Sequence, residues 1–178
     1  MLSYLHKSLQ PRIHYLPVKV GDLVKKKLPS LLTALFLPLA VGGLAAYFTR
    51  DAMAGYRLLR KPPFSPPGWV FPAAWTVLYL LMGFASWRIW RSDNPRRWEA
   101  LGEYALSLFF NFLWPLLFFS GGFWLAAFLL LLVLGLTVAD LIRRAASIDL
   151  TAALALVPYL LWLGFAGYLN LGVFLLNR

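Results

Sequence analysis

The sequence predicts an all-α membrane protein, a bundle of five transmembrane helices, and two observations support this fold class. Charged residues make up only 13% of the 178-residue chain, whereas an average soluble domain contains about 25%. The charges are also bunched, because residues 31–49, 62–87, 104–139 and 150–177 contain no Asp, Glu, Lys or Arg. About 20 helical residues cross a hydrocarbon core about 30 Å thick. A compact soluble bundle would need more polar residues to cover its surface.

Residues 1–29 form a basic leader in front of the predicted transmembrane domain, residues 30–178. Apolar residues alternate with its bases, so it suits either an amphipathic segment on the membrane surface or a disordered tail. It has no sustained apolar core, and no cleavable signal peptide is therefore expected.

The first two spans are separated by a proline-rich loop. The first span covers residues 30–49 and ends at Arg50-Asp51. Four prolines follow within residues 62–67, and proline fixes φ and removes a backbone donor, so a helix interior is excluded there. The second span therefore covers residues 69–90.

The remaining spans follow from the long uncharged block 104–139. As one helix it would extend about 54 Å, too long for a single crossing. Ser120-Gly121-Gly122 lies in its middle, and paired glycines favour a break. We predict spans at 98–119 and 123–142 joined by a tight hairpin, and a fifth span at 149–174.

The basic residues predict the orientation. Twelve of the 17 lie on the side of the amino terminus and five on the other side. Because cytoplasmic flanks are enriched in Lys and Arg, we expect a cytoplasmic amino terminus and an outward-facing proline-rich loop.

Several kinds of chemistry lack the residues they need. The chain has no cysteine, and both histidines, His6 and His14, lie in the leader, so no metal site or cofactor is expected within the bundle. Asp140 precedes Arg143 and Arg144 by three and four residues, a spacing that favours ion pairs on a helix. No nucleotide-binding loop or Ser/His/acid set is visible, which argues against classical enzyme chemistry.

The chain is unusually rich in tryptophan, with eight residues. Those near span ends suit an interfacial belt; they are Trp69, Trp87, Trp90 and Trp98. Trp75, Trp114 and Trp162 lie deep in their spans, where an indole N–H needs a partner. They face either the protein core or a ligand. Trp75 and Tyr79 share a helix face.

Three further features concern polar or small residues in the spans. Asn111 either bonds the carbonyl freed by Pro115 or offers a donor to a ligand. Asn170 is expected to bond a neighbouring helix. Gly42 and Ala46 form a pair of small residues that permits close helix approach.

The segment Lys61-Pro62-Pro63-Phe64-Ser65-Pro66-Pro67, followed by Trp69 and Trp75, resembles the translocator protein family. This family comprises the tryptophan-rich sensory proteins of bacteria and the peripheral benzodiazepine receptors of mitochondria. The resemblance runs from about residue 38 to 171, and its elements include Gly42-Gly43, Asn111 with Trp114-Pro115, and Pro158 to Trp162.

The resemblance implies a five-helix bundle, usually a homodimer, that binds porphyrins such as protoporphyrin IX in a pocket near the first loop. The positions that match this pocket are Ala46, Thr49, Trp75, Asn111, Trp114, Trp124, Trp162, Ala166 and Leu169. Trp75 and Trp162 also match the pair implicated in light-dependent porphyrin breakdown by bacterial members. In the loop, Arg57, Arg60 and Lys61 are candidates to contact the propionates, or form a solvated basic surface beside lipid heads.

The sequence departs from the family pattern at three places. Phe64 replaces a usual tryptophan, Pro72 comes one position early, and Tyr168 is followed by no base until Arg178. The last departure disfavours a sterol carrier. We therefore expect a receptor or transporter-like protein that binds a porphyrin or a similar flat aromatic ligand and has a role in tetrapyrrole sensing, transport or metabolism. Its other expected partner is membrane lipid, and no nucleic acid partner is expected. Photo-oxidative porphyrin breakdown and lipid or sterol binding are the alternatives.

Overall fold

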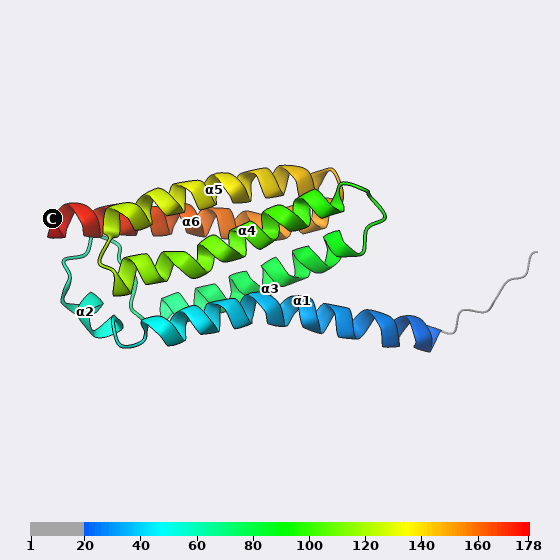
Figure 1. Ribbon diagram of the computed structural model, residues 1–178, viewed down its shortest axis with the longest axis horizontal. Helices are drawn as coiled ribbons and strands as arrows, with labels where there is room; N and C mark the ends of the chain where they lie inside the picture. The colour runs from blue at the N-terminus through cyan, green and yellow to red at the C-terminus, as the bar shows by residue number, and fades with distance from the viewer. Residues whose placement is uncertain (1–19) are drawn as a thin grey trace, which may run out of the picture.

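The computed structural model describes the backbone of residues 20–178 and the side chains of residues 30–178, except those of residues 53 and 54. Five long helices run along one axis (Figure 1). They are α1 (Val20–Thr49), α3 (Val70–Trp90), α4 (Arg97–Pro115), α5 (Trp124–Ala146) and α6 (Leu150–Asn177). Helix α1 begins ten residues before the predicted first span, so residues 20–29 of the predicted leader are helical. The prediction of an amphipathic segment or a disordered tail for the rest of the leader, residues 1–19, lies outside the described residues.

The five predicted spans are confirmed. Five apolar helical stretches of at least 20 residues are long enough to cross a membrane, and the third extends past the end of α4 to Ser120. The observed stretches are Ser30–Thr49, Val70–Trp90, Arg97–Ser120, Trp124–Ala146 and Leu150–Asn177. Their limits differ from the predicted ones by four residues at most.

Two short elements were not predicted. Helix α2 (Met53–Leu58) lies in the first loop, and the π-helix η1 (Leu116–Ser120) continues α4 after Pro115. Proline cannot donate to the helical ladder, and a π-helical turn is one way for a chain to pass such a residue. Gly121 and Gly122 then make the predicted hairpin turn, in which Gly122 has φ 63°, a conformation glycine adopts readily.

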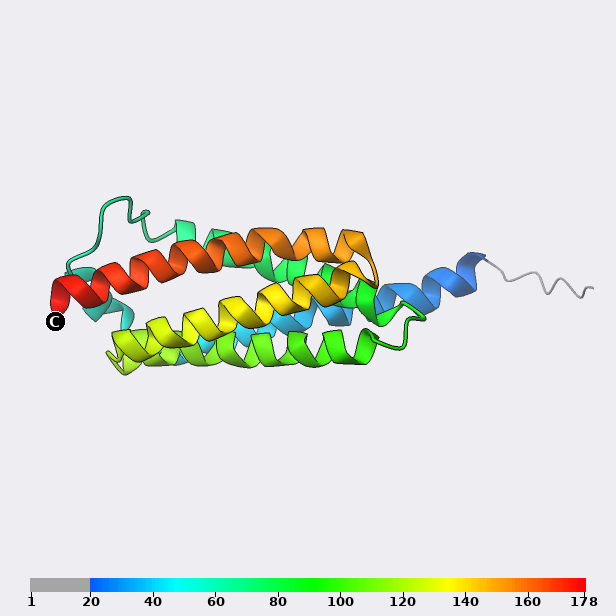
Figure 2. The same ribbon diagram turned by 90° about the horizontal axis from the view of Figure 1, so that it is seen from above.

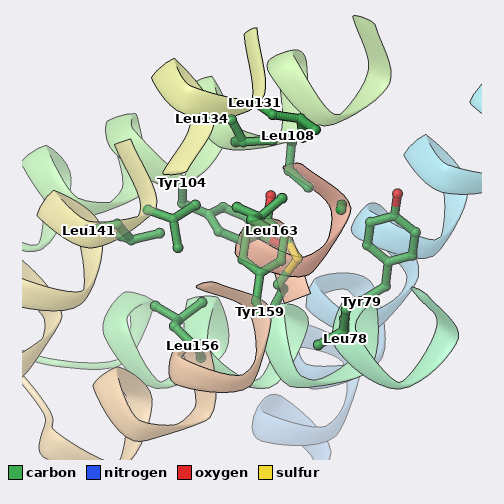
Figure 3. Close-up of a cluster of buried hydrophobic side chains, with 14 of the residues drawn as sticks. Leu78, Tyr79, Tyr104, Leu108, Leu131, Leu134, Leu141, Leu156, Tyr159 and Leu163 are labelled. Carbon is green, nitrogen blue, oxygen red and sulfur yellow. The ribbon is translucent and has the colours of Figure 1, made fainter. Parts of the chain in front are cut away.

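The helices form a closed ring in the order α1, α3, α6, α5, α4 and back to α1. Met82, Ile89, Leu134, Leu156 and Tyr159 are fully buried within it, and Figure 3 shows part of this core. The loops at 91–96 and 147–149 lie at one end of the bundle. Helix α2, residues 121–123 and the carboxyl terminus lie at the other, which we call the α2 end (Figure 2).

Close contacts join α1 to α3 along the half of the bundle away from the α2 end. The Trp87 indole donates to Ser30 Oγ at 3.2 Å. At Gly83, a Cβ would lie 2.5 Å from the Ala34 carbonyl oxygen, and at Gly42 one would lie 2.1 Å from the Tyr79 ring. The predicted close approach is therefore confirmed at Gly42, whereas Ala46, the other member of the predicted pair, is exposed. At Gly83 the contact is with backbone atoms, which leaves no room for a side chain.

Ion pairs tie the end of the bundle opposite the α2 end. Asp140 binds both Arg143 and Arg144, as predicted, and Arg144 also pairs with Glu99 at 2.6 Å. Arg88 of α3 pairs with Asp149 at 2.6 Å. Asp149 caps α6 by accepting from the Ala152 amide at 2.9 Å.

Candidate ligand-binding cavity

A cavity of about 1050 Å³ lies inside the bundle near the α2 end. Residues of α1, α3, α4, η1 and α6 form its walls, and α2 and the proline-rich loop form its rim. Pro115 and the π-helix place Phe118 and Phe119 in its wall. A pocket of this size accommodates a ligand of drug or cofactor dimensions.

The floor of the cavity is Tyr79. Its ring lies against Gly42 of α1, where there is no room for a side chain. The Trp75 ring stacks on Tyr79 at 5.4 Å between centroids, with an interplanar angle of 29°. Tyr79 therefore forms one of the contacts between α1 and α3 and also limits the cavity.

Two indoles form an aromatic corner where α3 meets α6. Trp75 and Trp162 lie edge to face, with centroids 6.4 Å apart, and Phe71 lies 6.2 Å from Trp162. All three side chains line the cavity. Their π faces and edges suit contact with a flat aromatic ligand.

The polar groups of the cavity fall into two sets. The Trp114 indole donates to Asn170 Oδ1 at 3.0 Å, and Asn170 Nδ2 donates to the Trp124 carbonyl at 2.7 Å. Asn170 therefore bonds its neighbours, as predicted. In contrast, Asn111 Nδ2 and Trp162 Nε1 are buried donors with no partner. A buried donor without a partner is costly, and a ligand acceptor would remove that cost.

The rim carries cations and a phenol. Lys61 Nζ lies 4.8 Å from the centre of the Tyr56 ring and donates to the Arg57 carbonyl at 3.3 Å. Burial raises the pKa of the Tyr56 phenol, so this group stays neutral at physiological pH. Arg57 and Lys61 both line the cavity and remain exposed.

Eight of the nine predicted pocket residues line this cavity: Ala46, Thr49, Trp75, Asn111, Trp114, Trp162, Ala166 and Leu169. The ninth, Trp124, lines a smaller hollow of about 180 Å³ beside Tyr56, Phe118 and Phe119. Of the three candidate propionate contacts, Arg57 and Lys61 line the cavity. Arg60 does not, and its backbone bonds Asn177 instead.

Sequence reasoning missed several lining residues. Phe118 and Phe119 reach the cavity through the π-helix, for which the sequence held no signal beyond Pro115. Tyr79, which shares a helix face with Trp75, also lines the cavity and is not among the predicted pocket residues. Phe64, which replaces a tryptophan in the family pattern, is 88% exposed and does not line the cavity.

No metal site is found among the side chains that the structure describes. No group of three His, Cys, Asp or Glu residues lies close enough there to hold an ion. The lining is aromatic, aliphatic and amide in character, which suits an organic ligand.

This fold and this site define a class of protein: a multi-pass integral membrane protein with an aromatic cavity inside a five-helix bundle. The sequence model of the TspO/MBR family matches residues 34–176. The chain therefore belongs to the TspO/MBR family.

Individual relatives agree. The chain is 39% identical to a translocator protein of Bos taurus over 138 residues, which cover 75% of this chain and 82% of the relative. It is 33% identical to a tryptophan-rich protein TspO of Chlorobaculum tepidum over 159 residues, or 86% of this chain and 99% of the relative. It is 38% identical to a tryptophan-rich sensory protein of Cereibacter sphaeroides over 122 residues, or 68% of this chain and 76% of the relative.

Proposed function

We propose that this membrane protein binds a porphyrin of the protoporphyrin IX type in the cavity and acts in tetrapyrrole sensing, transport or metabolism. The observation that carries the proposal is the corner formed by Trp75 and Trp162, whose rings lie 6.4 Å apart and line the same cavity. Offset and edge contacts between aromatic rings contribute about 0.5–1.5 kcal/mol each beyond area burial. A porphyrin offers an aromatic face to both indoles.

The polar groups of the cavity support the same class of ligand. The unpartnered donors Asn111 Nδ2 and Trp162 Nε1 suit ring nitrogens or carboxylates as acceptors. Arg57 and Lys61 at the rim suit the two propionates, because charge-assisted hydrogen bonds to carboxylates are the stronger kind. The names of the relatives, a translocator and a sensory protein, are consistent with a receptor or transport role.

Titration with protoporphyrin IX tests this proposal. Purified protein in nanodiscs is expected to show saturable quenching of tryptophan fluorescence. Trp162→Phe keeps a ring but removes the donor, so it should weaken binding, about tenfold for one lost hydrogen bond. The matched control Trp98→Phe changes an exposed indole outside the cavity and should leave the affinity unchanged. Quenching that never saturates would overturn the proposal.

A second candidate function is light-dependent oxidation of the bound porphyrin. The edge contact between Trp75 and Trp162 in the cavity places two oxidisable rings beside the ligand. Illumination of the complex in air is expected to give a new absorbing product, and Trp75→Phe should abolish it while binding persists. Equal product formation in that variant would exclude an indole role.

Orientation and assembly complete the proposal. A cytoplasmic amino terminus places the α2 end, and with it the mouth of the cavity, on the outer side of the membrane. Because the chain has no cysteine, Gly68→Cys and Asp93→Cys report the two ends without background. An impermeant maleimide added to intact cells should label the first and not the second. We also propose that the protein is a homodimer, as the family resemblance implies, and cross-linking in the membrane should trap it.

A further inference from the structure

The contact between α1 and α3 stops at the floor of the cavity. From Ser30 with Trp87, through Ala34 with Gly83, to Gly42 with Tyr79, the two helices touch. Toward the α2 end, the cavity lies between them instead. Four small or short residues border it there and are all exposed: Gly43 and Ala46 of α1, and Pro72 and Thr76 of α3.

This opening faces the side of the bundle. Gly43 lies six residues before the end of α1 at Thr49, and Thr76 lies six residues after the start of α3 at Val70. With a rise of 1.5 Å per residue, the opening extends about 9 Å along the spans. The opening therefore lies at the depth of the hydrocarbon of one leaflet, and it extends below the loops.

The surface around the opening suits lipid. Leu44, Tyr47 and Phe48 of α1 and Val77 of α3 are each at least 54% exposed. Two hydroxyls near it are bonded within their own helices, since Thr76 Oγ1 donates to the Pro72 carbonyl at 2.8 Å and Thr49 Oγ1 to the Ala45 carbonyl at 2.9 Å. Apolar molecules can therefore pass these two hydroxyls without leaving them unsatisfied.

The proline-rich loop, by contrast, is fastened to α6. Arg60 N donates to Asn177 Oδ1 at 3.0 Å, and Asn177 Nδ2 donates to the Arg60 carbonyl at 2.8 Å. The Tyr168 hydroxyl donates to the Pro63 carbonyl at 2.9 Å. Pro62 is buried against Gly172, where a Cβ would lie 2.5 Å from its ring. In the ring of helices α6 is not a neighbour of α1. These contacts between the loop and α6 therefore do not hold α1 against α3 at the opening.

We infer that the gap between Gly43 and Ala46 of α1 and Pro72 and Thr76 of α3 is a lateral entrance, through which apolar molecules dissolved in the bilayer reach the cavity. Its ligand class is a membrane-partitioned amphiphile with a flat or chain-like apolar body. The identity of that ligand as a porphyrin rests on the proposed function, but the entrance itself does not. A porphyrin that enters sideways keeps its apolar ring out of water and brings its propionates to the rim.

A single-cysteine assay tests the entrance without porphyrin. Ala166→Cys places the only thiol of the chain on the α6 wall of the cavity. The probe is a phosphatidylcholine that carries a maleimide on one acyl chain, mixed into nanodiscs. Phe at both Gly43 and Thr76 narrows the gap; a side chain at Gly43 meets nothing within 4 Å. The matched control places Phe at Leu44 and Val77, exposed neighbours that do not line the cavity.

We expect the lipid probe to label Ala166→Cys, and the Gly43→Phe/Thr76→Phe pair to slow labelling by about tenfold or more, which corresponds to about 1.4 kcal/mol of added barrier. The control pair should stay within about twofold of the parent. Equal labelling in the two pairs would overturn the entrance. So would an unlabelled parent whose thiol reacts with a small reagent in detergent.

Single variants and a porphyrin-binding measurement distinguish the remaining outcomes. If the double variant does not fold, Gly43→Phe and Thr76→Phe are used singly, and each should slow labelling in part. Labelling without saturable porphyrin binding would keep the entrance and refute the proposed ligand. Porphyrin binding whose rate is the same in the narrowed and control pairs would refute the entrance and keep the ligand.

Discussion

Trp114 of α4 and Asn170 of α6 are joined by a buried hydrogen bond of 3.0 Å from the indole Nε1 to the amide Oδ1. The same amide donates through Nδ2 to the backbone of Trp124 at the start of α5. One side chain thus links three helices beside the cavity. Asn111, which lines the same cavity, has an amide donor with no partner. The two asparagines therefore differ, because Asn170 links three helices whereas the Asn111 amide donor bonds no protein group.

Replacement of Asn170 should destabilise the bundle. Asn170→Leu leaves the Trp114 indole without a partner and removes the side-chain bond to the Trp124 carbonyl, and we expect a loss of roughly 1–2 kcal/mol of unfolding free energy. Unfolding by dodecyl sulfate in mixed micelles measures this. The control Thr137→Val removes a hydroxyl that bonds only the Val133 carbonyl of its own helix, and should change the stability by far less. Equal effects would show that the three-helix link is unimportant.

Asn111→Leu should weaken ligand binding without lowering the stability of the fold. It removes a buried donor that has no protein partner, so the unfolding free energy should stay the same or rise. Affinity for protoporphyrin IX should fall about tenfold, because one hydrogen bond to the ligand is lost. Parallel titration and unfolding of this variant check both effects. A variant that loses stability but binds normally would contradict the assignment.

Gly83 and Gly43 of the two contacting helices should respond oppositely to alanine. At Gly83 a Cβ would lie 2.5 Å from the Ala34 carbonyl oxygen and 2.8 Å from Leu35 Cα, so Gly83→Ala must separate α1 from α3. We expect a loss of about 1–3 kcal/mol. At Gly43 a Cβ meets nothing within 4 Å, and alanine favours a helix over glycine by about 1 kcal/mol. Unfolding curves that rank the two variants the other way would refute the contact.

Low pH should destabilise the end of the bundle opposite the α2 end, because the Asp149 carboxylate becomes protonated. The hydrogen bond from Arg88 and the Ala152 amide hold the pKa of this carboxyl below its ordinary value, which is about 3.9. Because the folded state binds the proton less readily, the stabilisation is present above that value and is lost as the pH falls through the folded-state pKa. Asp149→Asn keeps an acceptor for the cap but has no charge to lose. Between about pH 6 and about pH 3, the stability of the parent should therefore fall more steeply than that of the variant. Parallel curves would contradict the ion pair.

The sequence predicted the spans well because charge and length determine them. Uncharged blocks that end before Arg50, Arg88 and Asp140 left few alternatives, and Gly121-Gly122 marked the hairpin. The pairing of Asp140 with Arg143 and Arg144 followed from spacing on one helix.

What the sequence could not predict is rotation about the helix axes. A helix that is apolar on all sides has no face marked for the interior, so the spans alone do not show which side chains face the cavity. The family resemblance placed Trp124, at the start of α5, in the pocket, although it lines the neighbouring hollow. The π-helix turns Phe118 and Phe119 inward, and loop contacts direct Arg60 to Asn177. These outcomes depend on tertiary packing, which one sequence does not reveal.

The most direct test of the central claim is the nuclear magnetic resonance spectrum of the indole N–H groups during titration with protoporphyrin IX. The chain has eight tryptophans, and each gives its own signal. We predict that the Trp75 and Trp162 signals shift with saturation, while those of the exposed Trp69 and Trp98 do not. Shifts confined to Trp69, Trp90 and Trp98, with Trp75 and Trp162 unmoved, would place the ligand on the surface and contradict the account.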